Sequence, residues 1–432
     1  MKLPPIPKHS IKNLLIVYLG AVVNAVSLFL VNIILIRTID TDAYGAFTLA
    51  VLTLTTLAEM SDLGLNGAIT RFVPEFIKHG KTAALHEVVS IVYRLRIILS
   101  AGITITGLVF APQIAIFIFG QPAIAEAIRI GFLGVGGVVL LGFVSTYLKA
   151  TEQFVKNTWL QVLKGIIRVV AVLALSLTLA PQTPLLYIGI FVLVPWLILP
   201  FFLHVLPKKR TDSNQLSVGE KQTLKKEIAS FSGWLVVWSF AAIIGTRVDQ
   251  IMLSNMLSLE AVAIYAYGFQ FVFAYSFLQQ SFSAIIAPKM NIINSTSELQ
   301  SFVTRSFKWG LFGSLGVSMI TVVFVIFFRP TFFPDVYTAS LPVFILIVLA
   351  MMIAMICMPY TQIITVYKKS KLTAISGLIS LVVNIIGNAV LIPTYGTLGA
   401  AWAFFFSMTL STVFSLIFGY RLSKNVELDT IF

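Results

Sequence analysis

Charged residues are scarce in this sequence, and that scarcity excludes most classes of protein. Only 11% of the 432 residues are charged, while 58% are apolar. A typical soluble domain is about 25% charged, so a soluble chain of this length would be unable to cover its surface. Disorder is excluded because disordered chains are poor in apolar residues. The composition therefore predicts an integral membrane protein, with room for about twelve membrane helices.

Residues and motifs used in catalysis are sparse too. The single cysteine, Cys357, can form no intrachain disulfide, and none of the four histidines lies in the middle of an expected membrane helix. No HExxH, CxxC, Walker or GxSxG motif is present, so metal-dependent hydrolysis, ATP hydrolysis and serine catalysis have no visible apparatus. We therefore expect no enzyme activity and no cofactor. Uphill transport would need an ion gradient, for which H+ and Na+ remain alternatives.

Apolar runs long enough to cross a bilayer as α-helices follow one another along the whole chain. Turn-forming residues separate them, for example Pro112 and Pro122 between the third and fourth runs. We therefore expect an all-α integral membrane protein with twelve transmembrane helices. The expected helices cover residues 14–36, 44–67, 91–111, 124–148, 157–180, 185–206, 231–256, 261–287, 306–328, 338–366, 372–392 and 398–420.

Basic residues lie almost entirely on one side of this topology. A net charge of +13 would suggest a nucleic-acid partner in a soluble protein, but here the positions of the charges point to a membrane surface instead. Cytoplasmic loops are rich in Lys and Arg, so we place both termini in the cytoplasm, with lipids and no nucleic acid as neighbours. Of the 30 Lys and Arg residues, 24 lie on the predicted cytoplasmic side, in loops or near helix ends. Three lie outside, Arg37, Arg129 and Arg329, and three lie within helices, Lys164, Arg168 and Arg247.

A polar, basic loop over residues 207–230 divides the chain into two halves of six helices. The halves, residues 1–206 and 231–432, enter the membrane with the same orientation because six is even. If they are repeats, their symmetry axis runs along the membrane normal. A weak repeat supports this arrangement, since IDTDAYGAF opens the second helix of the first half and LEAVAIYAY opens its counterpart.

Two membrane helices carry charged stripes of opposite sign in the cytoplasmic half. Charge inside a membrane is costly, so each stripe needs a partner or a function. One interpretation is a structural set of ion pairs that locks the first half together. The other is a cavity wall, in which the cations attract an anionic substrate and an acid takes part in ion coupling. Spacing of four, three and four aligns Thr55, Glu59, Asp62 and Asn66 on the second helix, and Asn157, Gln161, Lys164 and Arg168 on the fifth.

Polar residues mark three further helices. Arg247 and Gln250 share a face of the seventh helix, whereas Asp249 lies about 200° round from Arg247. We expect one of Arg247 and Asp249 to face the lumen and the other to pack within its half; Arg247 is favoured for the lumen over snorkelling outward. Asn24 lies on the first helix. The eleventh helix has a polar stripe that favours interhelical hydrogen bonds and would also suit sugar hydroxyls, comprising Ser376, Ser380, Asn384 and Asn388.

Short motifs spread over the chain together resemble one family of transporters. They are Tyr44-Gly45 and Leu63-Gly64-Leu65 at the two ends of the second helix, Arg71 after it, Asp249 in the seventh helix, Tyr265 in the eighth, and NIIGNAVLIPTYGTLGAAWA from Asn384 to Ala403. This set resembles the Wzx-like oligosaccharide flippases, polysaccharide-transport proteins of the multidrug/oligosaccharidyl-lipid/polysaccharide exporter superfamily. The related lipid II flippases commonly have fourteen helices, against the twelve expected here.

The resemblance implies two six-helix lobes around a central cavity in the bacterial cytoplasmic (inner) membrane. It implies that an undecaprenyl-pyrophosphate-linked oligosaccharide moves to the outer leaflet by alternating access, with other glycan-assembly proteins as further partners. The headgroup of that substrate is anionic, which fits the intramembrane cations. The candidate residues are Lys164, Arg168, Arg247, Gln250 and Asn24 for substrate binding, and Glu59, Asp62 and Asp249 for ion coupling or structural ion pairs.

Two other functions remain as alternatives. A multidrug or small-solute antiporter on the same fold would favour an acidic cavity for cationic drugs, whereas basic residues here equal or exceed acidic ones within the helices. A membrane enzyme of glycan assembly would need clustered carboxylates or histidines in the membrane or the external loops, and these are missing. The flippase is therefore the leading hypothesis.

Overall fold

The computed structural model is helical throughout the residues that it describes, which are 8–178, 183–207, 219, 220, 222, 224, 226, 243–290, 292, 293, 295–332, 334–367 and 369–424. The chain divides into two compact units, Met1–Ile243 and Ile244–Phe432. The expected loop over residues 207–230 and the start of the expected helix over residues 231–256 lie largely outside the described residues. The predicted boundaries of the two halves therefore stay a prediction.

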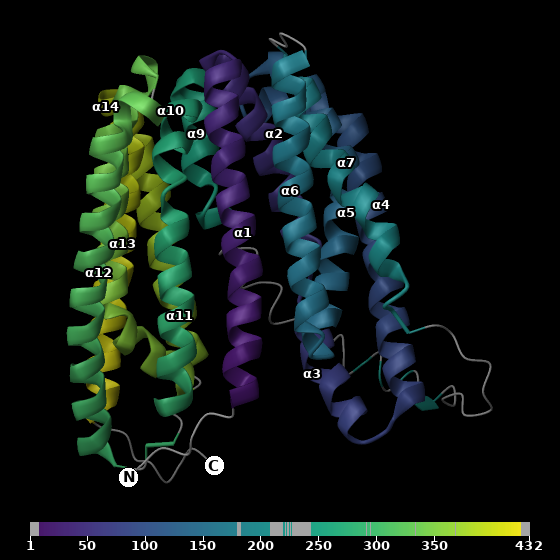
Figure 1. Ribbon diagram of the computed structural model, residues 1–432. Coiled ribbons are helices and arrows are strands. Elements are labelled where there is room, and N and C mark those ends of the chain that lie inside the picture. The colour runs from purple at the N-terminus through teal and green to yellow at the C-terminus, as the bar shows by residue number, and fades with distance from the viewer. Residues whose placement is uncertain are drawn as a thin grey trace. The chain divides into compact units, whose positions relative to one another are not determined.

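Each unit is a bundle of helices (Figure 1). The first contains α1 (Lys8–Thr38), α2 (Thr41–Met60), α3 (Leu65–Lys78), α4 (Thr82–Phe117), the short 3-10 helix η1 (Pro122–Ile124), α5 (Ala125–Ala150), α6 (Phe154–Thr178) and α7 (Pro184–Leu203). The second contains α9 (Val248–Met256), α10 (Leu259–Phe269), α11 (Val272–Met290), α12 (Thr296–Phe332), η2 (Asp335–Ala339), α13 (Ser340–Val366) and α14 (Ser370–Lys424).

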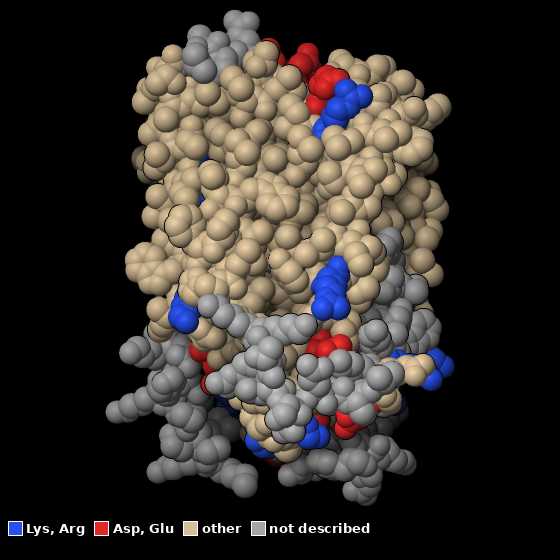
Figure 2. Space-filling view, turned by 90° about the vertical axis from the view of Figure 1, so that its right-hand side faces the viewer, with Lys and Arg blue, Asp and Glu red and all other residues tan. Residues whose placement is uncertain are grey.

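Nine helical segments within the described ranges are long and apolar enough to cross a membrane. Figure 2 shows one face with a broad, largely uncharged band, bordered by charged side chains near the top of the view and by others from its middle downward. An uncharged band of this kind is what a bilayer core requires. The protein is therefore a multi-pass membrane protein, and the count of twelve helices stays a prediction.

The helices depart from the expected ones where the backbone is interrupted. The second helix, expected over residues 44–67, is divided in the structure. The helix α2 ends at Met60 and α3 begins at Leu65, and residues 61–64 between them are called the joint. The expected eighth helix is interrupted between α10 and α11. The helices expected over residues 372–392 and 398–420 both lie within α14, where a non-helical backbone at Gly396, with a φ of 60°, separates them. Hydropathy locates apolar length, and none of these interruptions changes it.

Small residues let neighbouring helices approach α5, which contacts α2, α4 and α7. A Cβ atom at Gly131 would lie 3.0 Å from the carbonyl oxygen of Ala50 on α2. One at Gly134 would lie 3.0 Å from the side chains of Leu54 and Val192, on α2 and α7. Close packing through glycine is a common means of holding membrane helices together, and it makes α5 the centre of the first unit.

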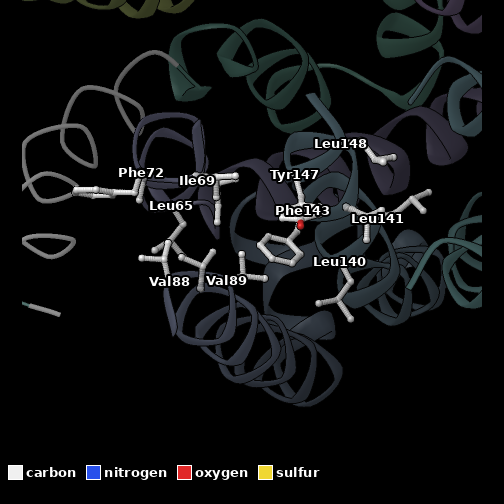
Figure 3. Close-up of a cluster of buried hydrophobic side chains, with 14 of the residues drawn as sticks. Leu65, Ile69, Phe72, Val88, Val89, Leu140, Leu141, Phe143, Tyr147 and Leu148 are labelled. Carbon is white, nitrogen blue, oxygen red and sulfur yellow. The ribbon is translucent and has the colours of Figure 1, made fainter. Parts of the chain in front are cut away.

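A buried apolar cluster fills the space between α3, α4 and α5 (Figure 3). It holds α3 against the membrane helices although α3 itself has an exposed polar face. Each fully buried aliphatic or aromatic side chain contributes about 1.5–3 kcal/mol. The labelled members are Leu65, Ile69 and Phe72 from α3, Val88 and Val89 from α4, and Leu140, Leu141, Phe143, Tyr147 and Leu148 from α5.

The weak internal repeat reappears in the way two helices begin. The Asp40 side chain caps α2 by accepting a hydrogen bond from the Ala43 N–H at 2.6 Å. The Ser258 side chain caps α10 by accepting one from the Ala261 N–H at 3.2 Å. Both caps act three residues ahead, with an acidic residue in the first turn of each helix. The second helix of each expected half therefore starts by the same device.

Candidate functional sites

Two cations on α6 form the first candidate site. Lys164 and Arg168 lie one turn apart and are half-buried. Within the described residues neither forms an ion pair with a carboxylate, and the charges that act on Lys164 are those of Arg168 and Lys149, both cations. The Arg168 guanidinium lies 4.6 Å from the centre of the Phe191 ring on α7, and its buried Nε has no hydrogen-bond partner. The cluster is positively charged, and an anion that bound there would displace no carboxylate of the described residues.

The other end of the α6 stripe has a structural role. Ser145 on α5 donates a hydrogen bond to the Asn157 side-chain oxygen at 2.6 Å. The Gln161 amide donates to the Ser145 hydroxyl at 3.4 Å. The stripe therefore divides: its first two members tie α6 to α5, and Lys164 and Arg168 are left for other partners.

Asn24 lies on the face of α1 that packs against α6. Thr158 on α6 donates a hydrogen bond to the Ile16 carbonyl at 2.7 Å, and Ser27 lies against Gly165. Asn24 falls between these two contacts along α1, one turn before Ser27. Its buried Oδ1 has no hydrogen-bond partner. An unused acceptor therefore lies in the same unit as the α6 cations.

One acid of the second expected helix pairs with a residue other than the α6 cations. Asp62 lies in the joint between α2 and α3 and forms an ion pair with Arg96 on α4. Glu59 is exposed on α2, and its predicted role stays a prediction. Helical spacing grouped Asp62 with Glu59 on one face, but Asp62 lies beyond the end of α2.

Arg96 is the functional residue that the pattern of loop charges misplaces. That pattern groups it with the cytoplasmic cations, because the expected third helix begins near it. The helix α4 instead begins at Thr82, and Arg96 is only 2% exposed. Its guanidinium also donates to the Asn66 side-chain oxygen at 2.9 Å. An Arg within ten residues of the start of an apolar run, with an Asp in the preceding helix, is the signal that indicates such a buried pair.

The second candidate site surrounds Asp249 on α9. This carboxylate is 3% exposed and accepts three hydrogen bonds from neutral donors. Asn384 and Asn388 on α14 donate to its Oδ1 at 2.8 and 2.7 Å, and the Tyr265 hydroxyl on α10 donates to its Oδ2 at 2.6 Å. The Oδ1 of Asn388 is buried without a partner. The site therefore holds an acidic group and an unused oxygen side by side, which suits a small cation or a proton.

Asp249 packs inside its own unit, whereas the other two predicted residues of this region lie at the surface of α9. Arg247 is the residue immediately before the helix and is half-buried. Gln250 is half-buried as well, and its side-chain oxygen is without a partner. The two asparagines of the expected eleventh helix make interhelical hydrogen bonds, the role that the sequence favoured for them. That these bonds converge on Asp249 is new information from the fold.

The fold matches several solved transporters. A lipid II flippase MurJ in an inward closed conformation has a TM-score of 0.72 at 15% identity, covering 95% of this chain and 87% of that one. A MOP superfamily transporter from Pyrococcus furiosus has a TM-score of 0.64 at 13% identity, covering 95% of each chain. The MATE multidrug transporter DinF-BH, solved as a complex, has a TM-score of 0.68 at 14% identity, covering 96% of each chain. All three are transporters, not enzymes.

Similarity at this level of identity establishes the fold, which is that of the MOP superfamily. Curated protein sequences give no significant match. The family model described as polysaccharide biosynthesis protein matches residues 10–290. That match spans more than half of the chain, so the protein belongs to the polysaccharide biosynthesis protein family.

Proposed function

We propose that the protein is a Wzx-like flippase that carries an undecaprenyl-pyrophosphate-linked oligosaccharide from the cytoplasmic to the outer leaflet of the bacterial inner membrane. Its family and the fold that it shares with a lipid II flippase support this proposal. The proposed architecture has twelve transmembrane helices in two six-helix lobes around a central cavity, with cytoplasmic termini. Alternating access moves the substrate, and membrane lipids and other glycan-assembly proteins are the further partners.

The pair Lys164 and Arg168 is the observation that carries the proposal. Two cations on successive turns of a membrane helix are costly unless an anion neutralises them, and the described residues provide no carboxylate for either. A pyrophosphate group is bound well by Arg and Lys, because charge-assisted hydrogen bonds to phosphate oxygens are strong. Asn24 contributes an unused amide oxygen for a sugar hydroxyl.

We also assign substrate binding to Arg247 and Gln250 in the second unit, and ion coupling to Asp249. A buried carboxylate held only by neutral donors keeps its charge uncompensated. Binding of H+ or Na+ at Asp249 would neutralise that charge, so the unit would differ in energy between its loaded and empty states. No other cofactor is part of the proposal.

Deletion and complementation test the cargo. Cells that lack the protein should accumulate lipid-linked repeat units on the cytoplasmic side and lose surface glycan, and the wild-type gene should restore both. The Lys164→Gln, Arg168→Gln double variant should restore neither. The competing function is a multidrug or small-solute antiporter, which is favoured by the fold shared with a MATE multidrug transporter. Unchanged surface glycan with raised sensitivity to cationic dyes would replace the flippase by the antiporter.

A further inference from the structure

The joint between α2 and α3 has an unusual backbone. Leu63 and Gly64 have φ values of 43° and 73°, both in the left-handed region. That region is unfavourable for a residue with a Cβ atom, so Leu63 stays there only because its surroundings hold it. No proline lies between Thr41 and Val73, but Gly64 stands in the joint, and glycine readily adopts a left-handed φ. Local sequence therefore tolerates the break at Gly64, whereas the left-handed φ of Leu63 needs support from tertiary contacts.

Arg96 supplies those contacts from α4. Its guanidinium forms the ion pair with Asp62 in the joint and donates to the Asn66 side-chain oxygen in the first turn of α3 at 2.9 Å. It also donates to the Val139 carbonyl on α5 at 3.3 Å. Asp62 in turn accepts a hydrogen bond from the Asn66 N–H at 3.1 Å and so caps α3. A planar guanidinium can reach acceptors on three elements at once, which an ammonium group does poorly.

The same network reaches the α6 cations through α5. Thr146 on α5 donates to the Asn66 side-chain oxygen at 2.8 Å. The neighbouring Ser145 donates to the Asn157 side-chain oxygen at 2.6 Å, on the same helix as Lys164 and Arg168. The joint and the helix that carries the cation pair are therefore connected through α5. A change in the joint would be passed to α6 by this route.

We propose that Arg96 is a positioning residue for transport: it holds the joint in its interrupted form and thereby sets how α5 supports the helix that carries the α6 cations. Arg96 is 2% exposed, and its guanidinium contacts Asp62, Asn66 and Val139. Buried ion pairs contribute little net stability compared with apolar packing, so a positional role explains the pair better than a stabilising one. The link to transport rests on the proposed function, whereas the effect on the joint does not.

The joint can be measured directly with spin labels on Asp42 and Lys78, which are exposed on α2 and α3. In one continuous helix their Cα atoms would be about 54 Å apart at 1.5 Å per residue. Pulsed electron resonance on the purified wild type, with its native cysteine replaced, should give shorter distances. Arg96→Gln should move part of the distribution towards the longer value, and Arg94→Gln, an exposed cation on the same helix, should not. An unchanged distribution in Arg96→Gln overturns the proposal.

A second pair of variants acts on the backbone and leaves Arg96 intact. Gly64→Val disfavours the left-handed φ, so it should shift the distances between the spin labels in the same direction as Arg96→Gln. If Arg96→Gln does not accumulate in the membrane, Gly64→Val tests whether the joint can lengthen. Leu63→Asn tolerates that φ, so adding it to Arg96→Gln should bring back the short distances and part of the transport rate. Failure of both backbone variants to move the distances would show that the joint is not a variable element.

Transport separates positioning from stability. At matched membrane level, Arg96→Gln should lower the transport rate about tenfold, a typical size for coupling between two sites, with the KM for the lipid-linked substrate unchanged. Arg96→Lys should give a transport rate between those of the wild type and Arg96→Gln, because lysine keeps the positive charge but lacks the forked donors of a guanidinium. A shifted distance distribution with a normal rate would overturn the positioning role. If the wild type moved no lipid-linked oligosaccharide, the proposed function would fail, and the distances would still decide whether Arg96 holds the joint.

Discussion

Neutralising Lys164 and Arg168 together separates a binding role from a structural one. Neither cation has a carboxylate partner in the described part of the chain, so Lys164→Gln with Arg168→Gln strands no acid. The double variant removes the interaction of Arg168 with the Phe191 ring, worth about 0.5–2 kcal/mol. Relief of like-charge repulsion one turn apart returns about 0.2–0.5 kcal/mol. We expect the free energy of unfolding to fall by about 2 kcal/mol at most.

Arg96→Gln serves as a reference variant with a larger expected loss of stability than the double variant. It leaves Asp62 without its counter-charge, and breaking a buried pair costs about 3–5 kcal/mol. The Asp62 side chain is 26% exposed, so we expect the lower end of that range. An unfolding entropy of about 2.1 cal/mol/K per residue makes 1 kcal/mol worth about 1 °C of Tm in a chain of 432 residues. Arg96→Gln should therefore lower the Tm in detergent by about 3 °C or more, and the double variant by about 2 °C at most.

Function is then measured on the same proteins. The double variant should insert normally and leave surface glycan absent, while Lys156→Gln, an exposed cation on the same helix, should retain both level and glycan. Adding Glu59→Gln and Asp62→Asn to the double variant should not restore surface glycan. Asp62→Asn should also lower the stability of the protein, because Arg96 loses its ion-pair partner. A quadruple variant with normal glycan would refute the binding role and show that the four charges act as a structural lock.

With the native cysteine replaced, a cysteine at Thr183 should react with an impermeant reagent in intact cells and one at His79 should not, because the loop charges place them on opposite sides; the reverse pattern would invert the topology. Asp249→Asn should abolish the response of transport to an imposed H+ or Na+ gradient in proteoliposomes, and an unaltered response would remove the coupling role. Gly131→Val should push α2 away from α5 and cost about 1–3 kcal/mol, whereas Gly142→Ala, whose Cβ would meet no atom within 4 Å, should not lower the Tm. Equal Tm values for the two glycine variants would contradict the close packing described.

Apolar length and loop charge predict the helical membrane character well, because both are properties of short segments. The interruptions of the helices cannot be predicted from apolar length and loop charge. Hydropathy does not mark the joint at residues 61–64, and the ion pair in the joint joins Asp62 to Arg96, which lies 34 residues further along the chain. The start of α4 at Thr82 cannot be predicted from apolar length and loop charge either, because this helix includes polar residues that precede the apolar run.

The candidate sites show the same division between local and long-range information. A helical period grouped the α6 stripe, whose four members lie in one helix, whereas the other stripe crosses the joint at residues 61–64. The cost of charge in a membrane correctly drew attention to Asp249 and Asp62. Which helix stands opposite each stripe is a tertiary property. Asp249 therefore has asparagine partners from α14, and Asp62 has Arg96, although the sequence suggested the α6 cations.

The hydrogen bonds of Asp249 also set an order of assembly. Its asparagine donors lie 135 and 139 residues further along the chain, whereas Tyr265 lies only 16 residues away. At about 5–20 residues per second, the ribosome needs about 7–27 s to supply the first asparagine. During that interval the newly inserted helix carries a carboxylate that only Tyr265 can reach among the residues described. A chain truncated before α14 would never supply the asparagine donors of Asp249. An acid without these donors in an apolar segment therefore distinguishes unfinished chains from completed ones.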